Sequence, residues 1–319
     1  MRLLFAGTPE AAVPTLNTLL AGDHDVVAVL TRPDAPTGRG RRLRPSPVRS
    51  AAEEAGIPVL TPTTLRDAGI QQQLRELDLD VAVVVAYGLI VPAAALAIPR
   101  HGWLNLHFSL LPELRGAAPA QRAILEGRRH TGMSVFRLAT GMDTGDLLRT
   151  ATTPIGATET AGELLERLAE EGAPLVDSAL TDLASGEATF TPQDDTAATT
   201  APKLTVEEAL LRPDRPREEV AAHIRGMSPH PGAWALFRGE RMKLLGVEDP
   251  ARVTPPDGLE LAPGRLHATK HELWLGTATS PLALSMLAPS GRRPMRAADW
   301  ARGAGLSGDE TLSAPQEAS

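Results

Sequence analysis

Residues 81–107 read VAVVVAYGLIVPAAALAIPRHGWLNLH, and this stretch decides the fold class. Residues 81–86 are apolar at every position, which is typical of a central strand covered on both faces. Residues 103–107 read as a second strand. On either side, short β-branched runs alternate with amphipathic stretches, which predicts an open, mostly parallel, Rossmann-like α/β sheet with crossover helices.

The expected elements of the first half continue this pattern outward. Further strands are predicted at 3–6, 26–30, 58–60, 133–138 and 147–150, and helices at 10–21, 48–55, 65–77, 119–126 and 162–183. Residues 186–205 are rich in Thr, Ala, Pro and Asp with little to bury, which predicts a linker. We therefore expect a first domain over 1–185.

Beyond the linker, a helix is expected within residues 206–227, followed by short strands separated by Gly and Pro. These strands, at 233–237, 242–247, 264–268, 273–276 and 282–287, predict a small C-terminal β-barrel domain over 206–305. Residues 306–319 are expected to form a disordered tail.

Composition excludes several classes of chemistry. The 319 residues contain no cysteine, so disulfides, thiolate nucleophiles and cysteine zinc sites are all excluded. His271-Glu272 lacks the second histidine of a zincin helix, and we expect no metal. The first residues enter a strand directly, no apolar run reaches membrane-spanning length, and we expect a cytoplasmic monomer.

Charge is distributed unevenly along the chain. The net charge is −7, yet residues 31–49 hold six arginines and one aspartate, a local net of +5. Glycines and prolines between Pro33 and Pro45 predict neither helix nor strand there. Such a loop can reach phosphates of a nucleic acid, although a basic stretch is more often a solvated charge run.

A candidate site follows the second quoted strand. Strand alternation places Asn105 and His107 on one face at the carboxyl end of a parallel strand, where α/β sheets bind ligands. Asp143 lies in a later turn, Met142-Asp143-Thr144-Gly145-Asp146. An amide and an imidazole can stabilise an oxyanion while a carboxylate handles a proton, as transfer of an acyl group to an amine requires. Taken singly, the histidine could be structural and the aspartate a turn former.

The ordered set of motifs resembles the folate-dependent formyltransferases. It comprises Phe5-Ala6-Gly7-Thr8-Pro9, Gly38-Arg39-Gly40, Pro45-Ser46-Pro47-Val48, Val84-Val85-Ala86-Tyr87-Gly88-Leu89-Ile90, Asn105 to His107, Ser109 to Pro112, Arg115 to Pro119, and Asp143 to Asp146. The resemblance implies that Asn105, His107 and Asp143 are catalytic. It implies a site for the donor 10-formyltetrahydrofolate lined by two loops, Ser109, Leu110, Leu111 and Pro112, and Tyr87, Gly88, Leu89 and Ile90.

The resemblance also implies an acceptor. It is nearest to the members that formylate initiator methionyl-tRNA, which implies that Arg39, Arg41, Arg42 and Arg44 contact the tRNA and that the barrel is of the oligonucleotide-binding type. Two alternatives stay open: a formyltransferase for a small amine, such as glycinamide ribonucleotide or an amino sugar, and a non-catalytic RNA- or folate-binding protein. The basic loop and second domain favour the tRNA, since a small acceptor needs neither.

Overall fold

The chain forms two compact units. The computed structural model describes residues 1–37 and 42–315. The first unit comprises Met1–Gly116, Gly132–Thr153 and Leu165–Thr200, and the second comprises Ala117–Thr131, Pro154–Leu164 and Ala201–Ser319. The units interleave along the chain, whereas the expected domains, 1–185 and 206–305, are contiguous.

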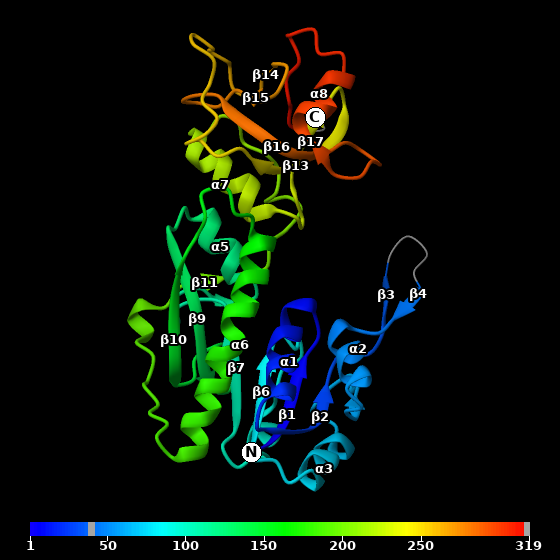
Figure 1. Cartoon of the computed structure of the whole chain (residues 1–319), viewed down its shortest axis with the longest axis vertical. Coiled ribbons are helices and arrows are strands. Elements are labelled where there is room, and N and C mark those ends of the chain that lie inside the picture. The colour runs from blue at the N-terminus through cyan, green and yellow to red at the C-terminus, as the bar shows by residue number, and fades with distance from the viewer. Residues whose placement is uncertain (38–41, 316–319) are drawn as a thin grey trace. The chain divides into compact units, whose positions relative to one another are not determined.

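The first unit contains the expected α/β sheet (Figure 1). Its strand order is β10-β9-β7-β6-β1-β2-β5, and the pairs among β1, β2, β5, β6 and β7 are parallel, while β9 runs antiparallel to β7. The strands are β1 (Arg2–Gly7), β2 (Asp25–Leu30), β5 (Val59–Leu60), β6 (Val81–Val85), β7 (Trp103–His107), β9 (His130–Arg137) and β10 (Leu147–Pro154). The predicted fold class is confirmed.

Helices cover both faces of this sheet. On one face, Ile70 and Leu74 of α3 (Ala68–Glu76) and Ala95 of α4 (Ala93–Leu96) pack in one cluster with Trp103 and other strand residues. On the other face, Gly172 of α6 (Ala161–Ser185) lies against the side chain of Leu106. The unit is completed by η1 (Glu10–Ala12), α1 (Val13–Ala21) and α2 (Pro47–Glu54).

The predicted linker is bound to the first unit along much of its length. Thr191 and Leu147 exchange two backbone hydrogen bonds of 2.8 Å, and the amide of Arg115 donates to the carbonyl of Thr199 at 2.9 Å. The segment also contains η2 (Asp195–Ala197) and leads into β11 (Thr200–Ala201). The segment is held by hydrogen bonds, so its low content of apolar residues does not predict that it is bound.

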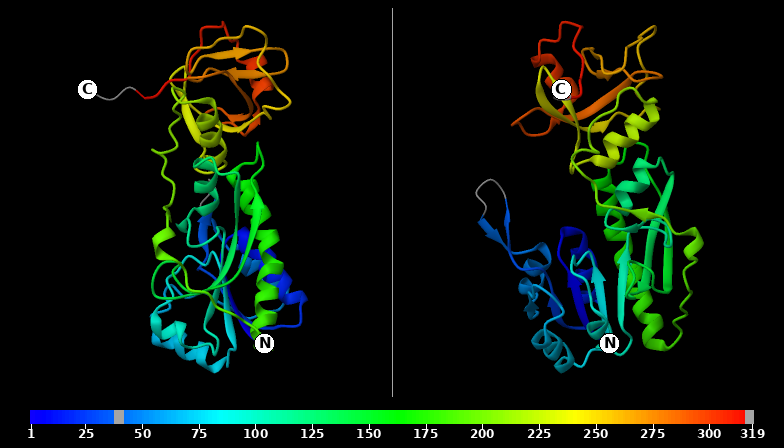
Figure 2. Two further views of the ribbon diagram at one scale, coloured as in Figure 1. Left: turned by 90° about the vertical axis from the view of Figure 1, so that its left-hand side faces the viewer. Right: turned by 180° about the vertical axis from the view of Figure 1, so that it is seen from behind.

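The arginine loop departs from the prediction of neither helix nor strand. Strands β3 (Ala35–Thr37) and β4 (Arg42–Arg44) pair antiparallel and project from the region of α2 (Figure 1 and Figure 2). Pro36 is tolerated because a two-stranded ribbon has free edges, where a missing backbone N–H costs no ladder bond.

The second unit combines an antiparallel sheet with helices. The sheet order is β12-β13-β16-β15-β14, with β17 paired to β16. The elements are β12 (Ala233–Phe237), β13 (Glu240–Val247), β14 (Leu266–Ala268), β15 (Leu273–Leu275), β16 (Leu282–Ala288), β17 (Met295–Arg296), α5 (Pro119–Leu125), α7 (Arg217–Met227) and α8 (Ala297–Gly303). Ile224, Leu244, Leu273 and Trp300 belong to its hydrophobic core.

Residues 306–315, which were expected to belong to a disordered tail, include residues that hydrogen-bond to strands of the second unit. Leu236 of β12 and Ser313 exchange backbone hydrogen bonds of 2.8 and 2.9 Å, and the amide of Leu266 in β14 donates to the carbonyl of Glu310 at 2.9 Å. Leu312 is buried in the core of this unit. This segment therefore hydrogen-bonds to both edge strands of the sheet, β12 and β14. Its polar composition does not predict this pairing.

Candidate active site

Strand β7 carries two of the three predicted catalytic residues to the middle of the sheet. Asn105 pairs with Val84 of β6 and Phe136 of β9, and His107 pairs with Ser134 of β9. Because successive side chains alternate between faces, Asn105 and His107 share a face, while Leu106 points toward α6. Asn105 is half-buried and His107 is buried.

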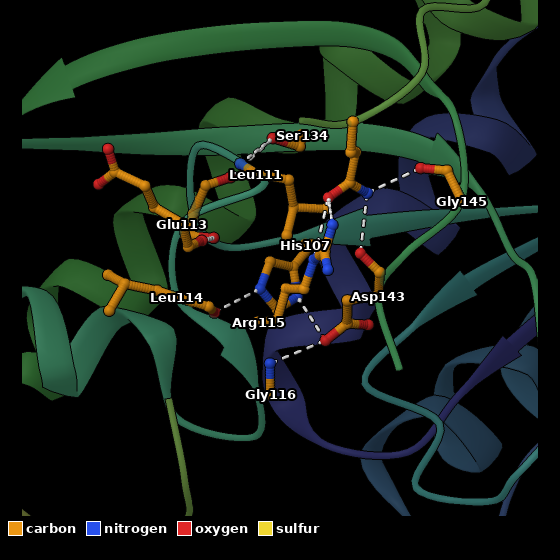
Figure 3. Close-up of polar contacts among 11 residues, drawn as sticks. His107, Leu111, Glu113, Leu114, Arg115, Gly116, Ser134, Asp143 and Gly145 are labelled. Carbon is orange, nitrogen blue, oxygen red and sulfur yellow. Dashed lines mark hydrogen bonds and ion pairs between the residues drawn. The ribbon is translucent and has the colours of Figure 1, made fainter. Parts of the chain in front are cut away.

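The ring of His107 is held by the loop that follows its own strand. Its Nε2 lies 3.0 Å from the carbonyl oxygen of Leu114 (Figure 3). A carbonyl only accepts, so Nε2 carries a proton and donates it. In the neutral imidazole, Nδ1 then presents a lone pair.

Asp143 faces the other ring nitrogen. Its Oδ2 lies 3.8 Å from Nδ1 of His107 and accepts a hydrogen bond of 2.8 Å from the amide of Gly116 (Figure 3). The 3.8 Å separation is too long for a hydrogen bond, so the carboxylate is an electrostatic neighbour of the ring. The structure thus brings His107 and Asp143 together from positions 36 residues apart in the sequence.

Burial and charge oppose one another at His107. Removal from water lowers the pKa of its imidazole, while the charge of Asp143 and the Leu114 carbonyl act in the opposite direction. Burial is the dominant effect, which favours the neutral ring. The same ring becomes easier to protonate when negative charge develops beside it.

Three residues that support this pair were not predicted as site residues. The side-chain amide of Gln193 donates to the carbonyls of Asp143, at 2.8 Å, and Gly145, at 2.7 Å. Arg115 donates to the Gln193 carbonyl oxygen at 3.1 and 2.7 Å, and the hydroxyl of Thr199 accepts from the amide of Leu114 at 2.9 Å. Gln193 lies 50 residues from Asp143, and Thr199 lies 85 residues from Leu114. No local sequence signal connects them.

The residues predicted to line the donor site divide into buried and exposed groups. Tyr87 and Leu111 are buried, and the hydroxyl of the fully buried Ser109 donates to the carbonyl of Glu113 at 2.6 Å. Ile90 is 79% exposed. The side chains of Tyr87 and Ser109 are therefore enclosed by protein, whereas Ile90 presents an apolar side chain at the surface.

A hollow adjoins the exposed end of this loop. Its volume is about 470 Å³, and it is lined by Arg66, Gln71, Ile90, Val91, Pro92, Ala93, Ala94 and Thr140. Its lining combines apolar side chains with the polar side chains of Arg66, Gln71 and Thr140.

Of the predicted tRNA contacts, Arg42 and Arg44 belong to β4. Arg39 and Arg41 fall outside the described residues, as does the side chain of Arg42. Arg44 is exposed on β4.

The described part of the chain contains no group of three or more His, Asp or Glu side chains that could hold a metal ion. None of the described helices combines the length and the hydrophobicity of a membrane span.

Known proteins match the chain along nearly its whole length. Residues 1–180 match the formyl transferase family, and residues 203–305 match the formyl transferase C-terminal domain. A protein of Streptomyces avermitilis named methionyl-tRNA formyltransferase is 48% identical over 98% of this chain and 100% of its own length. One of the same name from Thermobifida fusca is 49% identical, over 97% of this chain and 98% of its own.

Solved structures share the fold at much lower identity. The sugar 3N-formyl transferase WlaRD has a TM-score of 0.66 at 14% identity, covering 92% of this chain and 99% of its own. An N-formyltransferase from Helicobacter canadensis has a TM-score of 0.67 at 15% identity, covering 88% of this chain and 97% of its own. With these matches to both halves of the chain and close to half of all residues identical to those of full-length relatives, the protein belongs to the formyltransferase family.

Proposed function

We propose that this enzyme transfers the formyl group of 10-formyltetrahydrofolate to the α-amine of methionyl-initiator-tRNA, producing the formylmethionyl-tRNA that initiates translation. The relatives with this name match the chain across both of its family regions. The observation that carries the proposal is the placement of a buried imidazole between a carbonyl, which fixes its Nε2 proton, and a carboxylate facing Nδ1. This arrangement suits stabilisation of an oxyanion next to a proton acceptor.

The proposed reaction needs no nucleophilic side chain. The amine attacks the formyl carbon, and the carbonyl oxygen becomes an oxyanion. Asn105 donates to that oxygen through its amide. Nε2 of His107 is already engaged by Leu114, so only Nδ1 can donate, and it does so in the protonated ring. Burial favours the neutral ring at rest, while the Asp143 carboxylate and the negative charge developing on the formyl oxygen favour uptake of a proton from water at Nδ1.

Asp143 has the second proposed role. The attacking amine acquires a positive charge and must lose a proton, which Asp143 accepts through a water. Collapse of the oxyanion then breaks the bond between the formyl carbon and N10 of the folate, and the proton that Asp143 took from the amine returns through the water to N10. The products are the formylated amine and tetrahydrofolate.

The β3–β4 hairpin is proposed to bind the acceptor. Arg39, Arg41, Arg42 and Arg44 lie within a local net charge of +5 in an otherwise acidic chain, which attracts the phosphates of the tRNA. We propose the cytoplasm as the place of this reaction and a monomer as the working form. Size-exclusion chromatography with light scattering tests the latter.

One incubation tests the function. The enzyme is supplied with 10-formyltetrahydrofolate and either charged initiator tRNA, charged elongator methionyl-tRNA or an amino sugar. Formylation confined to the initiator tRNA supports the proposal. Formylation of the amino sugar with no product on tRNA would instead identify a small-amine formyltransferase, and no product with any acceptor would contradict transferase activity.

A further inference from the structure

The two groups that face His107 both sit on unfavourable backbone. Leu114 has φ of 58° and Asp143 has φ of 53°, in the left-handed region that side-chain-bearing residues seldom adopt. Such conformations persist at functional sites when surrounding contacts over-determine them. Particular contacts must therefore hold these two residues in place.

For Asp143, one such contact comes from Gln193. One side-chain amide donates both of its hydrogens, to the carbonyl of Asp143 at 2.8 Å and to that of Gly145 at 2.7 Å, so it grips the turn on two sides. Its oxygen accepts two hydrogen bonds from Arg115, at 3.1 and 2.7 Å. Two N–H donors and two lone pairs are the full capacity of a glutamine side chain, and all four are used.

Arg115 fixes which way this amide points. Its guanidinium only donates, so the glutamine oxygen must face it and the NH₂ group must face the turn. Arg115 is in turn held by Asp195, at 2.7 Å, and its side chain is only 12% exposed. The orientation of the Gln193 amide is thus set by contacts between the 193–195 segment and the loop after His107.

The turn itself offers few other restraints. Met142 is 73% exposed, and a Cβ at Gly145 would lie 1.6 Å from the Arg137 carbonyl oxygen, so no side chain can anchor that position. Other ties among the described residues include the Gly116 amide on the Asp143 carboxylate and a backbone bond of 2.9 Å from the amide of Arg137 to the carbonyl of Asp146.

We propose that Gln193, oriented by Arg115, is a positioning residue that holds Asp143 opposite His107 during formyl transfer. This inference rests on the function proposed above. Thr199, from the same segment, supports the other side of the ring by accepting from the amide of Leu114, whose carbonyl binds His107. One segment, 191–199, therefore supports both neighbours of the imidazole.

The substitution Gln193→Glu tests the proposal, because it keeps the shape and replaces the NH₂ donor by an acceptor oxygen. Two carbonyls then face a carboxylate, and the turn is released. Since a displacement of about 1 Å can cost about 100-fold in rate, we expect kcat to fall about 10- to 100-fold with little change in either KM. The matched control is Gln72→Glu on the exposed face of α3, which should retain wild-type kcat.

A double-mutant cycle separates positioning from general loss of structure. In single-turnover measurements, Gln193→Glu should add little to the loss already caused by Asp143→Asn, because both remove the same placed carboxylate. Equal fold-losses in the two backgrounds would overturn the proposal, as would an unchanged kcat in Gln193→Glu. If Gln193→Glu does not fold, Gln193→Asn, which is one methylene too short, replaces it.

Hydrogen exchange keeps this inference separable from the proposed function. Amide exchange of residues 142–146, followed by mass spectrometry, should accelerate in Gln193→Glu and not in Gln72→Glu. A wild-type enzyme that formylates no acceptor would contradict the function, and the exchange result alone would then decide whether Gln193 holds the turn. Exchange at the wild-type rate in Gln193→Glu would overturn that role.

Discussion

The carbonyl oxygen of Leu114 lies 3.0 Å from Nε2 of His107, and this contact determines which ring nitrogen is free to act on a substrate. Nδ1 is the free nitrogen, and it faces Asp143. The acid–base pair is therefore assembled from one strand end and two loops.

Replacement of His107 by alanine should abolish most turnover. Loss of an oxyanion donor costs about 100- to 1,000-fold in kcat, and donor affinity should be little changed because the proposed folate contacts lie on other loops. Steady-state kinetics with folate binding by fluorescence measures both. His101→Ala, at an exposed position before β7, is the control. Near-normal turnover in His107→Ala would remove the histidine from the mechanism.

Asn105→Asp changes the shape of the side chain very little, yet it should greatly reduce activity. The substitution replaces an amide donor by a negatively charged acceptor next to the developing oxyanion, so kcat should fall by about 100-fold or more while the fold is retained. Single-turnover rates and circular dichroism check this. A rate within a few-fold of wild type would mean that Asn105 does not contact the reacting oxygen.

The hairpin arginines should govern the salt dependence of tRNA binding. Arg41→Ala with Arg42→Ala should weaken binding and reduce the slope of log K against log salt by about 1 for each phosphate that is no longer neutralised. Filter binding at several salt concentrations measures the slope. Arg75→Ala removes an exposed charge from α3 and should leave the slope unchanged. Identical slopes for the hairpin variant and wild type would exclude the hairpin from the interface.

Acid should destabilise the second unit through His223. Burial lowers the pKa of this imidazole despite opposing effects of the Ala209 backbone and Glu208, so the folded form binds its proton less readily than the unfolded chain. Its contribution to stability is therefore complete above about pH 6.5, the unfolded value, and is lost as the pH falls below it. His223→Gln should flatten the fall in Tm between about pH 7 and about pH 5, whereas exposed His230→Gln should not. Equal pH dependence in both variants would contradict this account.

The fold of the first unit was largely predictable because its strands carry strong local signals. The predicted strand at 103–107 has the observed bounds, and 81–86 differs from β6 by one residue. The β3–β4 hairpin was missed because glycine and proline dominate its local signal, although the three-residue strands on either side contain no glycine. The pairing of residues 310–313 was missed because their partners lie far away in the chain.

The site was predictable only where motif and strand geometry coincide. Alternation along one strand places Asn105 and His107 together, and the turn motif supplies Asp143. Leu114 contacts His107 through its backbone carbonyl, and Gln193 contacts a turn that is distant in the sequence. Residue type predicts neither contact. Low apolar content around residue 193 predicted a linker, yet side-chain hydrogen bonds bind this segment to the site.

The attachment of the 191–199 segment limits where the protein could be divided. A fragment ending at residue 185 would retain the seven strands of the first sheet and all three proposed catalytic side chains, yet it would lack Gln193 and Thr199. Such a truncated half would bring the right chemical groups and leave them unaligned. A fragment ending at residue 200 would keep both Gln193 and Thr199, so the segment that contacts the site extends beyond the last helix of the first unit.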